Sequence, residues 1–81
     1  MNVNEALLLA RRRSGVSQVA LAGELKISPA FLSMIECQKK RFPARLLDRL
    51  PQGIREPVLE ALVSEKEAEI AQLRAGNGHA D

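Results

Sequence analysis

The stretch SQVALAGELKISPAFLSMIE, residues 17–36, decides the fold that this sequence predicts. Ser17 and Ser28 each stand at a position typical of a helix N-cap. Pro29 follows at a first helical position, where a missing backbone N–H costs nothing. Only two residues separate the first apolar segment from the second cap. We therefore expect two short helices joined by a tight corner.

The apolar residues of this stretch recur at spacings of three and four, which places them on one face of each helix. They are Leu21, Leu25, Leu32 and Ile35, with Ile27 filling the corner. The small Ala22 allows the two helices to cross closely. A core alone rarely requires this arrangement, whereas a protein that projects a short rigid helix into a groove does require it.

The rest of the chain is also predicted to be helical, because Leu, Ala, Glu and Arg dominate it and no stretch alternates for long like a β-strand. Asn4 as N-cap and Gly15 as terminator predict a helix over residues 5–14. Pro43 predicts the start of a further helix that ends near Leu50. The expected fold class is all-α.

Two prolines divide the C-terminal part of the chain. Pro51 and Pro57 bracket a short turn or helical segment, and residues 57–75 predict one long helix. The glycine-containing end, residues 76–81, is expected to be a disordered tail.

Length and composition limit the possible classes of protein. The 81 residues suffice for one small domain with a marginal core, so a partner subunit would add useful burial. The single cysteine, Cys37, excludes an internal disulfide and a zinc cluster within one chain. Glu5 interrupts the N-terminal apolar run, which is therefore unlike a signal peptide, and no run is long enough to span a membrane. We expect a soluble cytoplasmic protein.

The net charge of +2 conceals an uneven distribution. Residues 1–55 carry ten Lys or Arg and four Asp or Glu, a net +6, while residues 56–81 carry two and six, a net −4. The first part therefore attracts a polyanion and the last part repels one.

The segment QVALAGELKISPAFLSMIECQKKRF resembles the pattern Q-xx-LA-xx-L-x-(I/V)-S-xxx-(I/L)-S-x-(I/L)-E-xx-(K/R) of the phage repressor/Cro (XRE-like) family of helix-turn-helix DNA-binding regulators. Arg11 also matches a family position, and the resemblance implies that it forms a structural pair with Glu36. The resemblance covers roughly residues 4–50. It implies a lambda-repressor-like five-helix domain.

One position departs from the family pattern. The corner residue is usually Gly, because the turn requires a positive φ, and here it is Lys26. A left-handed lysine costs about 1 kcal/mol relative to glycine. The alternative is a turn that is built differently, with no functional role for Lys26.

The resemblance also implies which residues face DNA. The base-facing residues are Ser28, Pro29, Ala30, Phe31, Ser33 and Met34. These side chains provide apolar contact, for example with a thymine methyl, but no bidentate readout by Arg, Asn or Gln. Specificity would then depend on the basic run after this helix, on dimer spacing or on DNA shape. Phe31 has an alternative interpretation as a partly buried packing residue.

Four residues are expected to contact phosphates. They are Gln18, Lys39, Lys40 and Arg41. Gln18 has an alternative interpretation as an ordinary first-turn residue, and the basic run as a solvated loop. Arg12 and Arg13 are expected either to reach the DNA backbone or to form a solvated helix face.

The C-terminal helix carries a heptad-like seam. Its members are Leu59, Leu62, Val63, Lys66, Ile70 and Leu73. We expect residues 54–74 to form a homodimer interface, and the alternative is a helix folded back on its own domain. Three successive leucines, residues 7–9, exceed one helix face, so at least one of them is free to receive a partner.

These patterns divide the chain into residues 1–52 as a helix-turn-helix DNA-binding domain, 53–75 as a dimerisation helix and 76–81 as the tail. The expected function is that of a sequence-specific transcriptional repressor, which binds an inverted-repeat operator in double-stranded DNA as a homodimer. We expect the protein to be bacterial, or encoded by a phage or plasmid, and to be associated with the nucleoid. The alternative is a protein-interaction module of the antitoxin or adaptor kind that uses the C-terminal helix. No catalytic constellation is found, because the only histidine, His79, lies in the tail, and no cofactor, metal or small-molecule ligand is implied.

Overall fold

Five helices with short connections form the part of the chain that the structure describes. The computed structural model describes residues 2–78, and within this range the chain is helical with no strands. The elements are α1 (Val3–Arg13), α2 (Gln18–Leu25), α3 (Pro29–Glu36), the 3-10 helix η1 (Ala44–Arg49) and α4 (Gln52–Gly78). The predicted all-α class and the long C-terminal helix are confirmed.

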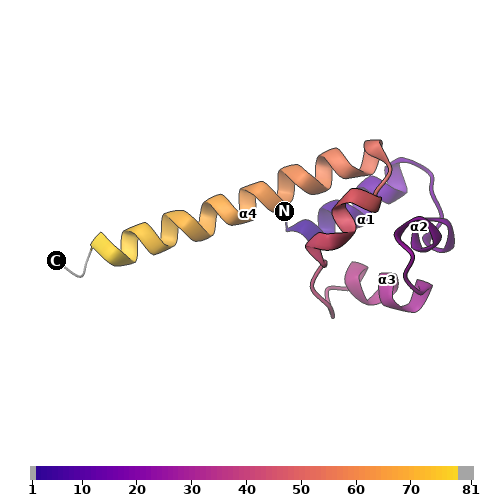
Figure 1. The fold of residues 1–81 in the computed structure, drawn as a ribbon, viewed down its shortest axis with the longest axis horizontal. Coiled ribbons are helices and arrows are strands. Elements are labelled where there is room, and N and C mark those ends of the chain that lie inside the picture. Colours follow the sequence, from indigo (N-terminus) through magenta and orange to yellow (C-terminus); the bar gives the residue numbers. More distant parts are fainter. Residues whose placement is uncertain (1, 79–81) are drawn as a thin grey trace.

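The helices form a small body from which one end of α4 projects (Figure 1). The first half of α4 lies along α1, and its second half extends alone to the far left of the view. In the same view α2 lies nearly end-on and α3 runs across the picture, so the two cross steeply at the edge of the body away from α4. This arrangement leaves the lower side of α3 open to solvent.

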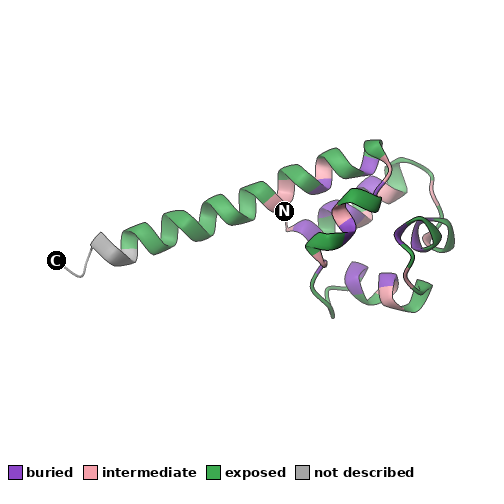
Figure 2. Ribbon diagram, in the orientation of Figure 1, coloured by how far each residue is buried: buried purple, intermediate pink, exposed green. Residues whose placement is uncertain are grey.

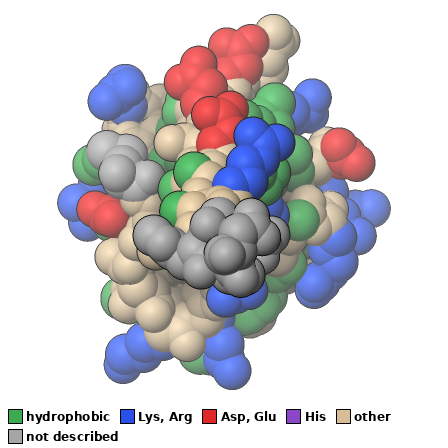
Figure 3. Space-filling model, turned by 90° about the vertical axis from the view of Figure 1, so that its left-hand side faces the viewer, with side chains coloured by type: hydrophobic (Ala, Val, Ile, Leu, Met, Phe, Trp, Pro, Cys, Tyr) green, Lys and Arg blue, Asp and Glu red, His purple; other side chains and the backbone are tan. Residues whose placement is uncertain are grey.

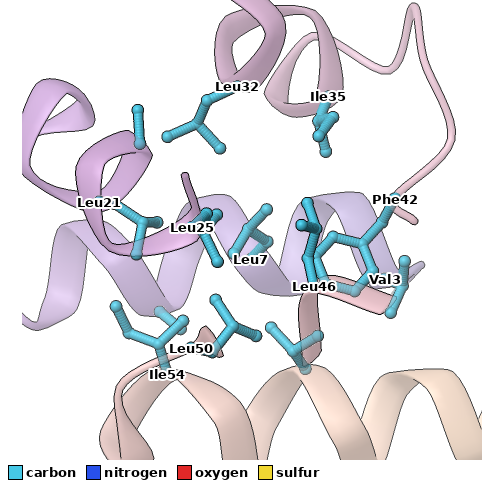
Figure 4. Close-up of a cluster of buried hydrophobic side chains, with 13 residues drawn as sticks. Val3, Leu7, Leu21, Leu25, Leu32, Ile35, Phe42, Leu46, Leu50 and Ile54 are labelled. Carbon is cyan, nitrogen blue, oxygen red and sulfur yellow. The ribbon is translucent and has the colours of Figure 1, made fainter. Parts of the chain in front are cut away.

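Side chains from every helix converge on one apolar core (Figure 4). Its fully buried members are Leu7, Leu21, Leu25, Leu32, Ile35, Leu46, Leu50, Ile54 and Val58. Burial of each such side chain contributes about 1.5–3 kcal/mol, so the core supplies the main driving force for folding. Ile27 and Phe31 are partly buried and pack against the edge of this core. The position of Ile27 agrees with its predicted place at the corner, and that of Phe31 agrees with its interpretation as a packing residue.

The start of α1 differs from the sequence prediction. Asn2, and not Asn4, is the N-cap: its side chain accepts a hydrogen bond of 2.8 Å from the Glu5 N–H, while Asn2 N–H donates to Glu5 at 3.4 Å. This capping box satisfies two otherwise unpaired N–H groups. The prediction was wrong because Asn2 and Asn4 are equally good caps in isolation, and contacts to distant parts of the chain recruit Asn4 elsewhere.

The boundaries of the last two elements also differ from prediction. The segment after Pro43 is a 3-10 helix, and Pro43 itself is its N-cap residue. The predicted break before Pro57 is absent, because α4 begins at Gln52 and continues through this proline. Pro57, the sixth residue of α4, removes one helical hydrogen bond, to the carbonyl of Gly53, and Gly53 is exposed, so water can bind that carbonyl instead.

The first turns of α4 belong to the core of the body. Ile54 and Val58 are fully buried there, so the predicted boundary at residue 53 does not separate two cores. At the other end, the backbone of α4 is helical to Gly78, which overturns the predicted tail for residues 76–78. The remainder of that tail, and His79 with it, lies outside the described residues.

Three successive helices end on a residue with left-handed backbone conformation. These residues are Gly15 (φ 71°), Lys26 (φ 57°) and Gln38 (φ 62°). After each, the next N–H donates to a carbonyl five residues back, for example Ile27 to Ala22 at 3.0 Å, which is the Schellman pattern. The predicted positive φ at Lys26 is confirmed. Only the first of the three positions is a glycine, so the other two carry a conformational cost.

Replacing Lys26 by glycine is expected to stabilise the protein. Removal of the left-handed penalty should raise the free energy of unfolding by about 1 kcal/mol, or the melting midpoint by about 4–8 °C for a domain of this size. Thermal unfolding followed by circular dichroism measures the change. The control Lys26→Ala removes the same side chain but keeps the penalty, so it should leave the midpoint near that of the parent. An equal rise in both variants would contradict the backbone explanation.

Candidate nucleic-acid interface

A serine caps the start of each of the helices α2 and α3, and the corner between them runs from the left-handed Lys26 to Ser28. The Ser17 hydroxyl accepts a hydrogen bond from Ala20 N–H at 3.0 Å, and the Ser28 hydroxyl accepts one from Phe31 N–H at 3.1 Å. Each bond satisfies one of the free N–H groups at a helix start. Because the left-handed Lys26 ends α2 and Ser28 caps α3 only two residues later, the two helices are joined by a tight corner.

A buried carboxylate ties α3 to the two preceding helices. One Glu36 oxygen accepts from Arg11 Nε at 2.6 Å, and the other accepts from Arg11 Nη2 at 3.0 Å and from Gln18 Nε2 at 2.9 Å. Arg11 Nη1 also donates to the Val16 carbonyl at 3.0 Å. Glu36 is only 8% exposed, so its charge is compensated by these donors. The pair expected between Arg11 and Glu36 is present.

Gln18 stands at the start of α2, and its side chain contacts α3. Its side chain is half-buried and donates to Glu36, as neither of its two sequence interpretations anticipated. The first backbone N–H groups of α2 have no acceptor within the helix, as at the start of any α-helix. The hydrogen bond to Glu36 links the start of α2 to the end of α3, and the phosphate contact of Gln18 stays a prediction.

The outer face of α3 is open to solvent (Figure 2). Ser28, Pro29 and Ala30 are exposed, and Met34 is 38% exposed. Ser33 is half-buried, as is Phe31, which packs against the core. The side chains on this face are therefore mostly small and apolar, and its polar groups are the hydroxyls of Ser28 and Ser33.

A basic loop follows α3 directly. Lys39, Lys40 and Arg41 are all exposed, and the left-handed Gln38 turns the chain into them. Asn4 holds this loop in place by donating to the carbonyls of Ile35 and Lys40, both at 2.8 Å. The structure thus places three cations beside the C-terminal end of α3. It also leaves Arg12 and Arg13 exposed at the end of α1.

Basic and acidic side chains lie on the two sides of a groove beside α4. Figure 3 views the molecule along α4 and shows acidic side chains gathered towards the top, with lysine and arginine side chains at the lower edge and at several other places around the outline. Between the basic loop and α4 lies an open groove, whose lining includes Lys39, Lys40 and Arg41 on one side and Glu65, Lys66 and Glu69 on the other. A polyanion is therefore attracted to the side of α3 and repelled from the α4 side of the groove.

Two positioning residues were missed by sequence reasoning. Asn4 was predicted as an N-cap, yet its acceptors lie 31 and 36 residues away. Arg49 Nη1 donates to the Leu25 carbonyl at 2.9 Å and so supports the C-terminal end of α2. No spacing in the sequence could have identified either contact, because both depend on how distant segments pack.

The predicted seam on α4 is mostly exposed. Leu59 is 42% exposed, Val63 46%, Ile70 47% and Leu73 67%, whereas Leu62 packs against the core of its own body. Lys66 is exposed, and its Nζ lies 3.7 Å from Glu69 Oε2. The surplus of leucines on α1 is also present, since Leu9 is 40% exposed.

No helix among the described residues combines the length and the apolar character needed to cross a membrane. Within residues 2–78 no group of three or more His, Cys, Asp or Glu side chains is arranged to hold a metal ion. The chain matches no protein-family model, no curated protein and no solved structure.

Removal of the Glu36 carboxylate is expected to destabilise the body strongly. Glu36→Ala leaves the Arg11 guanidinium without its counter-charge in a mostly buried site, a loss of about 3 kcal/mol. Urea denaturation measures the change. Replacing both partners, as Arg11→Met with Glu36→Leu, should recover much of the loss because no unpaired charge remains.

Glu24 of α2 provides the matched control, since it is exposed and lies outside this cluster. Glu24→Ala should change the free energy of unfolding by less than about 0.5 kcal/mol. A similar loss for Glu24→Ala and Glu36→Ala would show that the buried pair is not responsible.

Proposed function

We propose that this protein is a helix-turn-helix transcriptional repressor that binds double-stranded DNA, with α3 as the recognition helix. The observation that carries the proposal is the position of α3. Its inner face is held by Leu32, Ile35 and the Glu36 cluster, while its outer face is open and followed at once by three exposed cations. A short helix held rigidly at the edge of a body has the dimensions to enter the major groove.

Electrostatics support a nucleic acid as the partner. The net +6 of residues 1–55 includes exposed side chains such as Lys39 and Arg41, which lie at the end of α3. Lysine and arginine near phosphates release condensed counterions, which supplies sequence-independent affinity. We infer that Lys39, Lys40 and Arg41 contact the DNA backbone on one side of α3.

The side chains of α3 define a restricted form of base readout. Ser28 and Ser33 provide hydroxyl groups, and Pro29, Ala30 and Met34 provide apolar contact with thymine methyl groups. We infer that the remaining specificity comes from sequence-dependent DNA shape and from the spacing of two half-sites.

The proposed binding unit is a homodimer formed through α4. The seam on this helix is exposed in the single chain, and two copies would cover it. A two-fold dimer binds an inverted repeat when its recognition helices lie about 34 Å apart, one turn of DNA. Such a dimer would repress transcription by covering a promoter in the bacterial nucleoid.

The test of DNA binding is fluorescence anisotropy with DNA from upstream of the protein's own gene and with the same DNA scrambled. We expect the native sequence to bind about a thousandfold more tightly or better at physiological salt. Replacing Lys39, Lys40 and Arg41 by alanine should weaken both complexes and reduce the slope of log K against log salt by about 2 to 3.

Glu24→Ala serves here as a control on α2 that leaves the cations in place. Weak binding of both DNAs, lost together as salt rises, would reduce the interaction to electrostatics alone. The alternative function, that of a protein-interaction module, would then replace the proposed function as a repressor.

Charge placed in the seam is expected to separate the dimer. Leu59→Asp/Leu73→Asp introduces two carboxylates per chain into an apolar contact, and sedimentation equilibrium should then show a monomer. Ser64→Asp/Ala71→Asp adds the same charge on an exposed side of α4 away from the seam and should leave the dimer intact. A dimer that survives the first substitution would place the interface elsewhere.

A further inference from the structure

Helix α4 presents two separate apolar faces. The inner face packs on the body through Ile54 and Val58, and Glu65 continues it by accepting a hydrogen bond of 2.7 Å from Val3 N–H at the start of α1. The second face carries five side chains, which we name the outer stripe. Its members are Leu59, Val63, Lys66, Ile70 and Leu73.

The two faces point in different directions around the helix. With about 100° per residue, the five positions of the outer stripe fall within about 80° of one another. The inner face lies about 120° away from the centre of the stripe. Because the body already occupies the inner face, the chain cannot cover its own stripe without releasing Ile54 and Val58 from the core.

The flanks of the outer stripe identify its occupant. Glu60 and Glu67 lie along one edge, Glu69 lies along the other, and Lys66 stands in the middle. The acidic edges repel DNA, so DNA is not the partner of this stripe. A suitable partner has an apolar seam, acidic side chains that can pair with Lys66 and a basic side chain that can pair with the glutamates. The α4 helix of a second copy has all of these groups. Because a two-fold axis places the same surface on both sides of the contact, their spacing on one helix matches their spacing on the other.

We propose that the outer stripes of two copies pack against each other in an antiparallel pair. This inference rests on the dimer of the proposed function and specifies its geometry. In a parallel pair in register, the two Lys66 side chains would face each other in the seam, where like charges repel. In the antiparallel pair, Leu59 packs against Ile70 of the second copy, and Val63 packs against Lys66 of the second copy.

The antiparallel register also gives each cation an acidic neighbour. Lys66 lies beside Glu60 and Glu67 of the second copy, because these residues flank the position opposite it by three and four residues. The same register brings Glu60 of one copy near Glu67 of the other, and Lys66 offsets this like-charge contact. Arg74 lies beside Glu56 of the second copy. The two-fold axis passes between residues 64 and 65, and the bodies lie at opposite ends of the helix pair, because each body surrounds the start of its own α4 (Figure 1).

Disulfide cross-linking without DNA distinguishes the two orientations. Cys37 is exposed and free, so the background is the full chain carrying Cys37→Ser. Leu59→Cys and Ile70→Cys are prepared as separate chains, then mixed, incubated and treated with oxidised glutathione. Positions 59 and 70 face each other across an antiparallel pair, whereas 59 and 59, or 70 and 70, are offset by about 16 Å along the helix axis.

We expect a cross-linked dimer only in the mixture, with the mass of one chain of each kind. Cross-linking of each chain with itself would overturn the antiparallel orientation while leaving a dimer. A monomer by sedimentation, or a dimer without any cross-link, would overturn pairing through the outer stripe. DNA binding by the Cys37→Ser chain is measured separately, so that failure of this inference and failure of DNA recognition are distinguished.

A charge reversal tests the contacts of Lys66 independently. Glu60→Lys/Glu67→Lys places cations beside Lys66 of the second copy and should weaken dimerisation at least tenfold. Adding Lys66→Glu to this variant should restore most of the affinity. Weakening without restoration would contradict the assigned contacts of Lys66, and no weakening at all would do so as well.

Discussion

The Glu36 carboxylate is the contact on which the position of α3 depends. It receives two bonds from Arg11 of α1 and one from Gln18 of α2, and it lies one residue after the buried Ile35. Apolar packing alone would bury one face of α3 but would leave its rotation loosely defined. Directional hydrogen bonds to a buried charge remove that freedom, because any rotation of α3 would leave the charge uncompensated.

Tight connections are the second constraint on this small chain. A body of this size has to reverse direction after each short helix, and it does so three times through a left-handed residue. Only Gly15 does this without cost, while Lys26 and Gln38 are held in place by the packing around them. Gln38 also accepts a bond of 2.7 Å from Asn2, which links the end of α3 to the start of α1.

Helix α4 serves two purposes because its two faces are independent. Its start completes the core through Ile54 and Val58, and Glu65 places a negative charge at the N-terminus of α1, where the helix dipole favours it. The outer stripe is left free by this arrangement. A helix that stabilises one body and still presents a seam suits a protein whose own core is small.

The sequence by itself determined the helical class, the corner at residues 26 and 27 and the caps Ser17 and Ser28, and the resemblance to a family pattern implied the pairing of Arg11 with Glu36. These features depend on local periodicity and cap chemistry, which act within a few residues, or on a motif with fixed spacing. Only the tertiary structure decided that Asn2 caps α1 while Asn4 holds the basic loop, that Gln18 turns inward and that Pro57 lies within a continuous helix. The physical reason is that each of these outcomes is a competition between equally good local partners, and it is settled by segments that meet only when the chain has folded.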